Sequence, residues 1–322
     1  MLRQLIIDSL KEGGRILIAS HMNPDGDSIG SQLAIYDLCK QLGADPVIVS
    51  HDPLDERYRF LGKFELIQKY DPTQEYGKFA QAVILEGTEI SRIGDVVKIV
   101  TDGCRIINID HHSGNKEYGA INWVEEERAA VGIMIRELFT EAGIELSQNN
   151  LDELYLAVMT DTGRFTFSNT DAESLALAAE LVGAGANPKL ISDAIYSSYT
   201  ESQIRLLGEL IAGMELHHEG RTCLLVCDRK LLNKYGNEAA EMEGLVNYSL
   251  YTRGVQVGLL LREFEKDSIK VSLRSQSAFD VAALARQFSG GGHPTASGCN
   301  IDKPLAEARR TLLQLIGEGV AA

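Results

Sequence analysis

The chain has 322 residues, a hydrophobic content of 44 % and a net charge of −15. This length predicts two domains, and the hydrophobic content is ordinary for a globular core. No apolar run approaches the roughly 18 residues that cross a bilayer, so no membrane partner is expected. The first 13 residues mix charged and apolar side chains, which predicts an amphipathic helix rather than a signal peptide.

The acidic charge argues against a stable complex with long nucleic acid, whose phosphates would repel the chain. Residues 216–322 contain 13 basic and 12 acidic side chains, which leaves 18 and 34 in residues 1–215. An acidic part that attracts cations and a near-neutral part that accepts a phosphorylated ligand are compatible with one shared site, although two solvated surfaces would look the same. Because the five cysteines are odd in number and scattered, unlike a disulfide framework, a reducing cytoplasm is expected.

Apolar segments alternate with helical patterns over residues 1–195. The predicted strands cover residues 15–20, 46–50, 82–85 and 104–109. The predicted helices cover residues 28–42, 91–100, 125–142, 149–160, 174–182 and a stretch from 188, with shorter ones near 54–61 and 74–81. Because strands that alternate with helices form parallel sheets, we predict an α/β fold whose first domain has a doubly wound, mostly parallel sheet.

The pattern changes after residue 195. Residues 196–215 predict a connecting helix. A strand at 221–227, a hairpin of 255–263 with 268–274, and helices at 279–288 and 305–316 follow it. We therefore predict a smaller α+β domain over residues 216–322 and a bilobal chain with a ligand site in the cleft between the domains.

A short polar loop follows the first predicted strand. His21, Asp25 and Asp27 lie in it, and Asp27 or Ser28 would cap the next helix. A strand, a polar loop and a helix place ligands at the carboxyl edge of a parallel sheet. One imidazole and two carboxylates suit a divalent cation such as manganese, although an Asx-rich turn with a surface histidine would contain the same residues.

Other predicted element ends in the first domain carry similar side chains: Glu86, Asp110-His111-His112 and Asp161. Parallel connectivity would bring these ends to one edge of the sheet. Oxygen and imidazole donors without thiolates fit manganese, magnesium or cobalt better than structural zinc, and six or seven donors suit two ions. Two ions about 3.5–4 Å apart activate a water and neutralise charge on a phosphoryl oxygen.

Four motifs in this order resemble those of the DHH phosphoesterase family. They are SHMNPDGDSIGS at residues 20–31, IDHH at 109–112, TDTG at 160–163 and GGGH at 290–293. The resemblance covers nearly the whole chain, and the size and the glycine cluster are most similar to the nanoRNase and pAp phosphatase branch with a C-terminal DHH-associated domain.

The resemblance implies a role for each motif residue. The expected ligands are His21 and Asp25 for one manganese ion, and mainly Asp27, His111 and Asp161 for the other. The family's bridging aspartate is replaced here by Glu86, whose extra methylene could shift the metal spacing or the water. Asp110 would orient His111, and His112 would lie beside the scissile phosphate and stabilise its charge or assist the leaving oxygen.

The predicted substrate-binding residues lie in both domains. They are Arg274, Gly290, Gly291, Gly292, His293, Arg92 and Arg164. The glycines would let backbone amides approach a phosphate because no Cβ intervenes, and the arginines would clamp a phosphate or carboxylate. Without the resemblance, a helix end and surface arginines would explain the same residues.

The expected function is hydrolysis of short oligoribonucleotides and 3′-phosphoadenosine 5′-phosphate (pAp), through a water that two manganese ions activate; magnesium or cobalt could replace manganese. The alternatives are a phosphodiesterase for cyclic or linear dinucleotides, a nucleotide-binding regulator whose turnover is impaired by Glu86, and an inorganic pyrophosphatase. The resemblance also implies a homodimer through the first domain, to which an apolar face of the helix at 125–142 would contribute.

Overall fold

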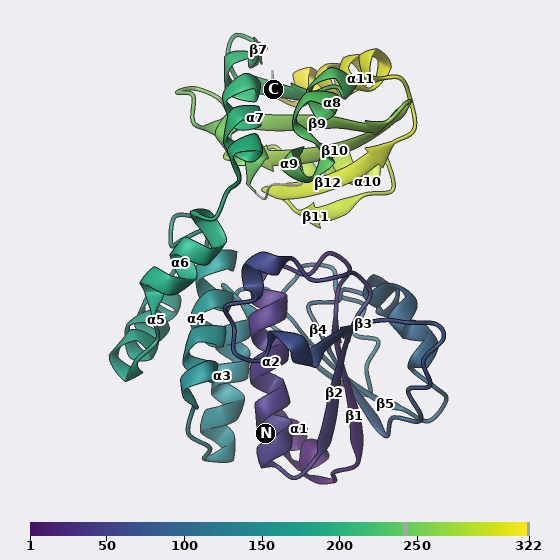
Figure 1. Cartoon of the computed structure of the whole chain (residues 1–322), viewed down its shortest axis with the longest axis vertical. Helices are drawn as coiled ribbons and strands as arrows, with labels where there is room; N and C mark the ends of the chain where they lie inside the picture. Colours follow the sequence, from purple (N-terminus) through teal and green to yellow (C-terminus); the bar gives the residue numbers. More distant parts are fainter. Residues whose placement is uncertain (241–243, 321–322) are drawn as a thin grey trace. The chain divides into compact units, whose positions relative to one another are not determined.

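The structure is a computed structural model that describes residues 1–240 and 244–320. The chain divides into two compact units, Met1–Ser198 and Tyr199–Ala322, each with its own six-stranded sheet (Figure 1). The predicted α/β class is therefore confirmed. Within the described residues, no helix combines the length and the apolar character that crossing a bilayer requires.

The first unit is built around a parallel sheet. Its strands are β1 (Arg15–Ser20), β2 (Asp45–Ser50), β3 (Ile67–Lys69), β4 (Gln81–Leu85), β5 (Arg105–Asp110) and β6 (Ile121–Val124). Its α-helices are α1 (Leu2–Lys11), α2 (Gly26–Gln41), α3 (Val131–Ala142), α4 (Gln148–Asp161), α5 (Ala172–Ala184) and α6 (Pro188–Tyr196). Short 3-10 segments are η1 (Glu56–Tyr58), η2 (Phe64–Leu66) and η3 (Ile90–Ile99).

The strand order in this sheet is β3-β2-β1-β4-β5-β6, and all neighbouring strands are parallel. The order reverses between β1 and β4, which pair from Ile16–Gln81 to Ser20–Leu85. In open α/β sheets, ligands bind beyond the carboxyl ends of the strands at such a reversal. His21 follows β1 and Glu86 follows β4, so both lie at this position.

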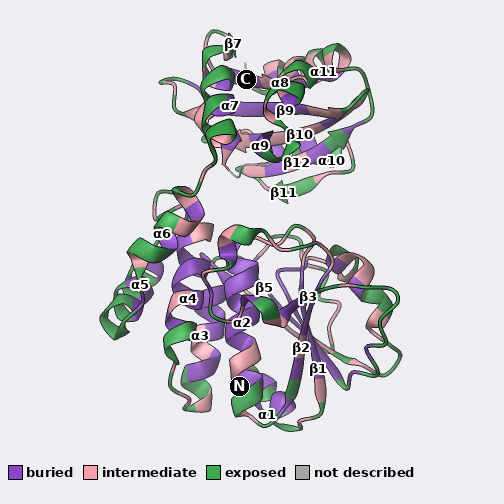
Figure 2. Cartoon of the chain, in the orientation of Figure 1, coloured by how far each residue is buried: buried purple, intermediate pink, exposed green. Residues whose placement is uncertain are grey.

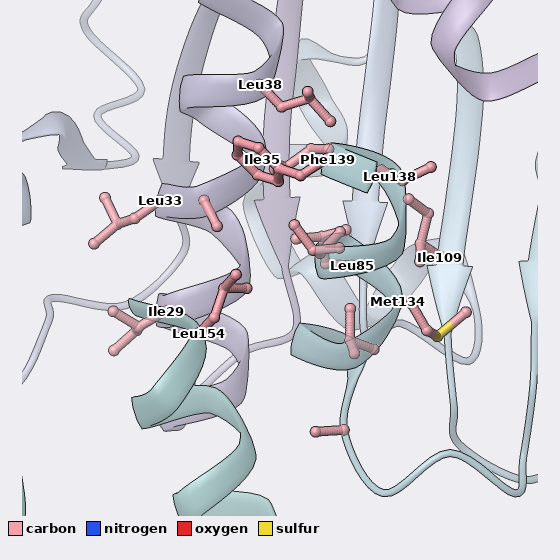
Figure 3. Packing of buried hydrophobic residues seen from close by; sticks show 14 of the residues in the cluster. Ile29, Leu33, Ile35, Leu38, Leu85, Ile109, Met134, Leu138, Phe139 and Leu154 are labelled. Carbon is pink, nitrogen blue, oxygen red and sulfur yellow. The ribbon is translucent and has the colours of Figure 1, made fainter. Parts of the chain in front are cut away.

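The main core of this unit lies between the sheet and helices α2, α3 and α4. One buried cluster contains Leu33 of α2, Leu85 of β4, Ile109 of β5, Leu138 of α3 and Leu154 of α4 (Figure 3). A second cluster, which includes residues of η3, covers the opposite face of the sheet. Helix α2 is consequently buried over most of its length (Figure 2).

Small residues let α2 and α4 approach closely. A Cβ on Gly30 of α2 would lie 2.2 Å from the carbonyl oxygen of Glu153 in α4, a distance that real Cβ atoms do not show. Because α2 carries Asp27 in its first turn and α4 ends at Asp161, this contact sets how far apart two of the predicted ligands lie.

The second unit has a mixed sheet of order β11-β12-β10-β9-β8-β7, in which only β8 and β9 pair in parallel. Its strands are β7 (Glu215–His217), β8 (Thr222–Cys227), β9 (Val257–Glu265), β10 (Ser268–Ser275), β11 (Gly291–His293) and β12 (Ala296–Ile301). Its helices are α7 (Glu201–Ala212), α8 (Arg229–Tyr235), α9 (Asn237–Ala240), η4 (Leu245–Leu250), α10 (Val281–Arg286) and α11 (Leu305–Val320). The predicted connecting helix corresponds to α7, which packs in the core of this unit through Leu206 and Leu210.

Two predicted helices differ in the structure. The helix predicted at 125–142 begins only at Val131. Its apolar face is buried in the core of the unit, and its outward side chains, including Arg136 and Glu141, are polar or charged. The predicted helix at 74–81 is absent, because Gly77 turns the chain with a φ of +70° and Gln81 already belongs to β4.

Replacing Gly30 with alanine should lower the stability of the first unit. The added methyl group must push α4 away from α2, and overpacking of this kind costs about 1–3 kcal/mol. Thermal unfolding followed by calorimetry would measure the change. The control is Gly208→Ala in α7, where nothing lies within 4 Å of the added Cβ, and which should be neutral or stabilising. Equal stability of Gly30→Ala and wild type would contradict the close approach.

Candidate functional site

The loop between β1 and α2 directs two side chains toward the sheet edge. Asp25 caps α2, since its Oδ1 accepts the backbone N–H of Ser28 at 3.0 Å. The predicted cap at Asp27 or Ser28 was therefore wrong, because Asp27 already lies inside the first turn. The Nδ1 of His21 lies 2.8 Å from the carbonyl oxygen of Met22, so Nδ1 carries the proton and Nε2 is left as the ligand atom.

Asp27 is fully buried and is held by the N-terminus of α3. Its Oδ2 accepts the N–H of Val131 at 2.6 Å, and its Oδ1 accepts the N–H of Gly132 at 2.9 Å and the hydroxyl of Ser31 at 2.9 Å. A carboxylate at a helix N-terminus satisfies amides that have no partner within the helix. This contact fixes the Asp27 side chain and explains why α3 starts at Val131.

The six predicted ligands form one cluster. The donor atoms form two groups, and within each group all donor atoms lie within 4.8 Å of one another. One group is His21, Asp25 and Glu86, and the other is Asp27, Glu86 and His111. Asp161 adjoins the second group, because its Oδ2 lies 3.6 Å from Nε2 of His111. Glu86 is the residue that the two groups share.

Glu86 reaches this position through an unusual backbone conformation. Its φ is +56°, in the left-handed region that non-glycine residues rarely adopt, and its N–H donates to the carbonyl oxygen of Ile109 at 3.0 Å. The hydroxyl of Ser28 donates to its Oε2 and also lies 3.0 Å from Nε2 of His21. The sequence motif includes Ser28, but nothing in its spacing indicated this contact.

The cluster concentrates negative charge away from water. Burial, and then repulsion from Asp27 and Asp25, raise the pKa of Glu86 well above its usual value. Burial raises the pKa of Asp161 to about 8. Burial lowers the pKa of His21, whereas for His111 contact with Glu86 and the charge of Asp161 outweigh burial and raise the pKa.

The donor set fits divalent cations. Among the described residues, the carboxylates of the cluster form ion pairs only with the imidazoles of His21 and His111. Carboxylates that converge in a buried site are costly unless positive charge compensates them. Imidazole nitrogens and carboxylate oxygens are the donors that manganese, magnesium and cobalt accept.

The DHH motif places its side chains differently from our expectation. Asp110 was expected to orient His111, but Nδ1 of His111 instead lies 2.8 Å from the carbonyl oxygen of Arg128. Asp110 Oδ1 lies 2.8 Å from Nδ1 of His112 and accepts the N–H groups of His111 at 2.8 Å and of His112 at 3.1 Å. The carboxylate therefore orients the half-buried His112, because the chain turns so sharply after β5 that both amides point back at it.

Asn115 completes this arrangement, although no sequence pattern marks it as a site residue. Its Nδ2 donates to Oδ2 of Asp110 at 2.6 Å and lies 3.1 Å from the carbonyl oxygen of Gly87. Its Oδ1 accepts from Nδ2 of Asn108 at 2.9 Å. Both oxygens of Asp110 are thus engaged, one by His112 and one by Asn115.

The predicted substrate arginines have different surroundings. Arg92 lies near His21, where its charge adds a small part to the pKa lowering that burial dominates. The guanidinium of Arg164 lies 4.6 Å from the ring centroid of Tyr196. In the second unit, Nε of Arg274 donates to Oδ1 of Asn247 at 3.0 Å.

The glycine cluster leads into β11, an edge strand of the second sheet. A Cβ on Gly290 would lie 2.2 Å from the carbonyl oxygen of Gly298, and one on Gly292 would lie 2.5 Å from that of Ala296. These two glycines are therefore required by the close approach of β12. At Gly291, in contrast, nothing lies within 4 Å of an added Cβ. His293 pairs with Ala296 at the end of the strand.

Sequence comparisons agree with these motifs. The family model described as "DHH family, N-terminal domain" matches residues 15–160, and the DHHA1 domain matches residues 224–321. The bifunctional oligoribonuclease and PAP phosphatase NrnA of Thermus thermophilus is 32% identical over 317 residues, 98% of this chain and 93% of that protein. The protein of the same name from Bacillus subtilis is 27% identical over 89% of each chain.

A solved structure has the same overall fold. The exopolyphosphatase-related protein from Bacteroides fragilis superposes with a TM-score of 0.91 and 27% identity, over 99% of this chain and 98% of that chain. Both units therefore have counterparts in known proteins, and one relative above 30% identity matches nearly end to end. The chain belongs to the DHH family of metal-dependent phosphoesterases.

Proposed function

We propose that this chain hydrolyses short oligoribonucleotides and pAp with two manganese ions. The observation that carries the proposal is the pair of donor groups that share Glu86, since one carboxylate common to two donor groups can bridge two ions about 3.5–4 Å apart. The near full-length likeness to proteins named oligoribonuclease and PAP phosphatase supports the substrate class.

Each donor group would hold one ion. His21 and Asp25 would bind the first, the second would be bound by Asp27, His111 and Asp161, and Glu86 would contact both. When bound, two such ions supply an activated water and neutralise charge on the phosphoryl oxygen. The N-terminus of α3 fixes the carboxylate of Asp27, and the hydroxyl of Ser28 fixes that of Glu86, before any metal binds. These two side chains would therefore reorganise little on metal binding.

His112 would act on the leaving oxygen or stabilise the developing charge. Oδ1 of Asp110 already accepts two backbone N–H groups, so it acts as an acceptor and the proton of the ring resides on Nδ1 of His112. Burial opposes the ionisation of Asp110, but the hydrogen bonds from His112 and Asn115 hold its pKa below the usual value. Nε2 would then be the ring atom through which His112 acts on the substrate.

The phosphates of the substrate would be bound by residues of both units. These are Arg92, Arg274, the glycines 290–292 and His293.

Location and oligomeric state are also proposals. The five cysteines are unpaired, in keeping with the proposed cytoplasmic location. A homodimer through the first unit would need a surface other than α3, whose outward side chains are polar or charged.

Metal-dependent turnover of defined substrates tests the proposal. Chelator-treated protein would be supplied with manganese, magnesium or cobalt and given a 5′-labelled diribonucleotide, pAp, a cyclic dinucleotide or pyrophosphate. We expect manganese to restore the fastest hydrolysis of the diribonucleotide and pAp. Tight binding without turnover that Glu86→Asp does not change would indicate a regulator, and preferred hydrolysis of pyrophosphate would indicate a pyrophosphatase.

Asp161→Ala should reduce turnover of the diribonucleotide by more than about 100-fold. Removing partners outside the ligand shell already costs 10–100-fold in metal affinity or activity, and Asp161 is a proposed ligand. Steady-state kinetics and calorimetric titration with manganese would measure the loss. The control is Asp193→Ala on α6, a partly exposed aspartate paired with Lys189, which should leave turnover unchanged. Near-normal turnover of Asp161→Ala would make the metal assignment wrong.

Asn115→Ala should lower kcat about 10–100-fold while KM and manganese affinity change little, because it frees the Asp110 carboxylate that orients His112. The matched control is Asn122→Ala. Asn122 accepts from Nδ2 of Asn108 at 3.2 Å in the same amide network, and the other hydrogen bonds of its side chain join it to the backbone of Gly119. If both variants behave alike, the effect is one of packing and Asn115 does not position His112.

A further inference from the structure

The loop that follows Asp161 has a strained backbone. Gly163, Arg164 and Phe165 are consecutive left-handed residues with φ of 55°, 61° and 60°. Left-handed non-glycine residues cost on the order of 1–3 kcal/mol each and persist only where surrounding contacts determine them; they cluster at ligand-binding positions. The strain therefore marks this loop as a candidate ligand-binding segment.

Several hydrogen bonds hold the loop against the end of α4. The N–H of Phe165 donates to Oγ1 of Thr162 at 3.2 Å, and the N–H of Phe167 donates to the carbonyl oxygen of Thr162 at 3.0 Å. From the far side of the loop, Nδ2 of Asn169 donates to the carbonyl oxygen of Asp161 at 3.1 Å. The loop is thus fixed relative to a proposed metal ligand.

The left-handed turn separates two phenylalanines. Phe165 points inward and packs edge-on against Tyr155, with ring centroids 6.2 Å apart. Phe167 points outward and is 47% exposed. Its ring lies on Gly163, where a Cβ would be 2.4 Å from ring carbons, so only glycine allows this placement. The ring of Phe167 is therefore held at the surface by its contact with Gly163 and does not pack in the core.

A cation lies in the same loop. The guanidinium of Arg164 lies over the ring of Tyr196, and a cation–π contact of this kind restricts its orientation. The Cα atoms of Asp161 and Gly163 are at most about 7.6 Å apart, because two trans peptides separate them. The glycine on which the exposed ring lies is therefore close in the chain and in space to a proposed metal ligand.

We propose that Phe167 is the stacking surface for a nucleobase of the substrate, with Arg164 contacting an adjoining phosphate. This inference rests on the proposed function and names what recognises the nucleoside part of the substrate. Every base has a π face, so stacking on one ring selects for a nucleotide without selecting its sequence. Inorganic pyrophosphate and polyphosphate carry no base and gain nothing from this surface.

The test compares a 5′-phosphorylated diribonucleotide with analogues that carry an abasic residue at either position. Kd from fluorescence anisotropy, measured in calcium to prevent turnover, and KM in manganese are determined for wild type, Phe167→Ala and Phe167→Trp. We expect wild type to bind the intact diribonucleotide more tightly than one of the two abasic analogues, the one that lacks the stacked base. Phe167→Ala should weaken binding of the intact substrate about 5- to 150-fold, the range for one base–aromatic stack, and abolish that preference. Phe167→Trp should keep it.

The control is Leu190→Ala on α6, a 43% exposed apolar side chain whose truncation should change neither Kd nor KM. Equal wild-type affinity for the intact and both abasic substrates would overturn the stacking surface while leaving the phosphoesterase proposal intact. The same holds if Phe167→Ala keeps the preference. Conversely, base-dependent binding without hydrolysis would support the stacking surface and contradict the proposed turnover.

Discussion

Convergence of four carboxylates on one buried point is the constraint on which the rest of the site depends. Mutual repulsion and loss of hydration would drive these groups apart or protonate them, as the raised pKa values of Glu86 and Asp161 indicate. The fold holds them together nonetheless. Divalent cations would relieve this repulsion, so the electrostatic cost that the packing of α2 against α4 offsets would contribute to the affinity for metal.

The parallel sheet makes this convergence available. Its strand order reverses between β1 and β4, and the residues that follow these strands, His21 and Glu86, reach the same space. Asp161 arrives from the end of α4 rather than from a strand. The close approach at Gly30 therefore matters as much for the site as the strand register does.

Features encoded locally were predictable from the sequence. The strands ending at Ser20 and Leu85 follow from apolar runs, and the structure confirms them. The hairpin predicted at 255–263 with 268–274 is also confirmed, with strands at 257–265 and 268–275. The six residues were predicted as ligands because each lies where a predicted buried segment ends. Parallel connectivity predicted the convergence of the residues at strand ends, whereas Asp161 reaches the cluster from the end of helix α4.

Contacts between distant parts of the chain were not predictable. The start of α3 depends on Asp27, more than a hundred residues earlier. The pairing of Asp110 with His112 instead of His111 depends on how sharply the chain turns after β5, and Asn115 acts through that turn. Even the inward and outward directions of Phe165 and Phe167 follow from backbone dihedrals that no residue pattern specifies.

Anomalous diffraction at the manganese absorption edge, from crystals grown with manganese, tests the central claim most directly. The account predicts two peaks, one within bonding distance of His21, Asp25 and Glu86 and the other of Glu86, Asp27, His111 and Asp161. A cluster without a manganese peak, or a peak bonded to none of Asp27, His111 and Asp161, would contradict it.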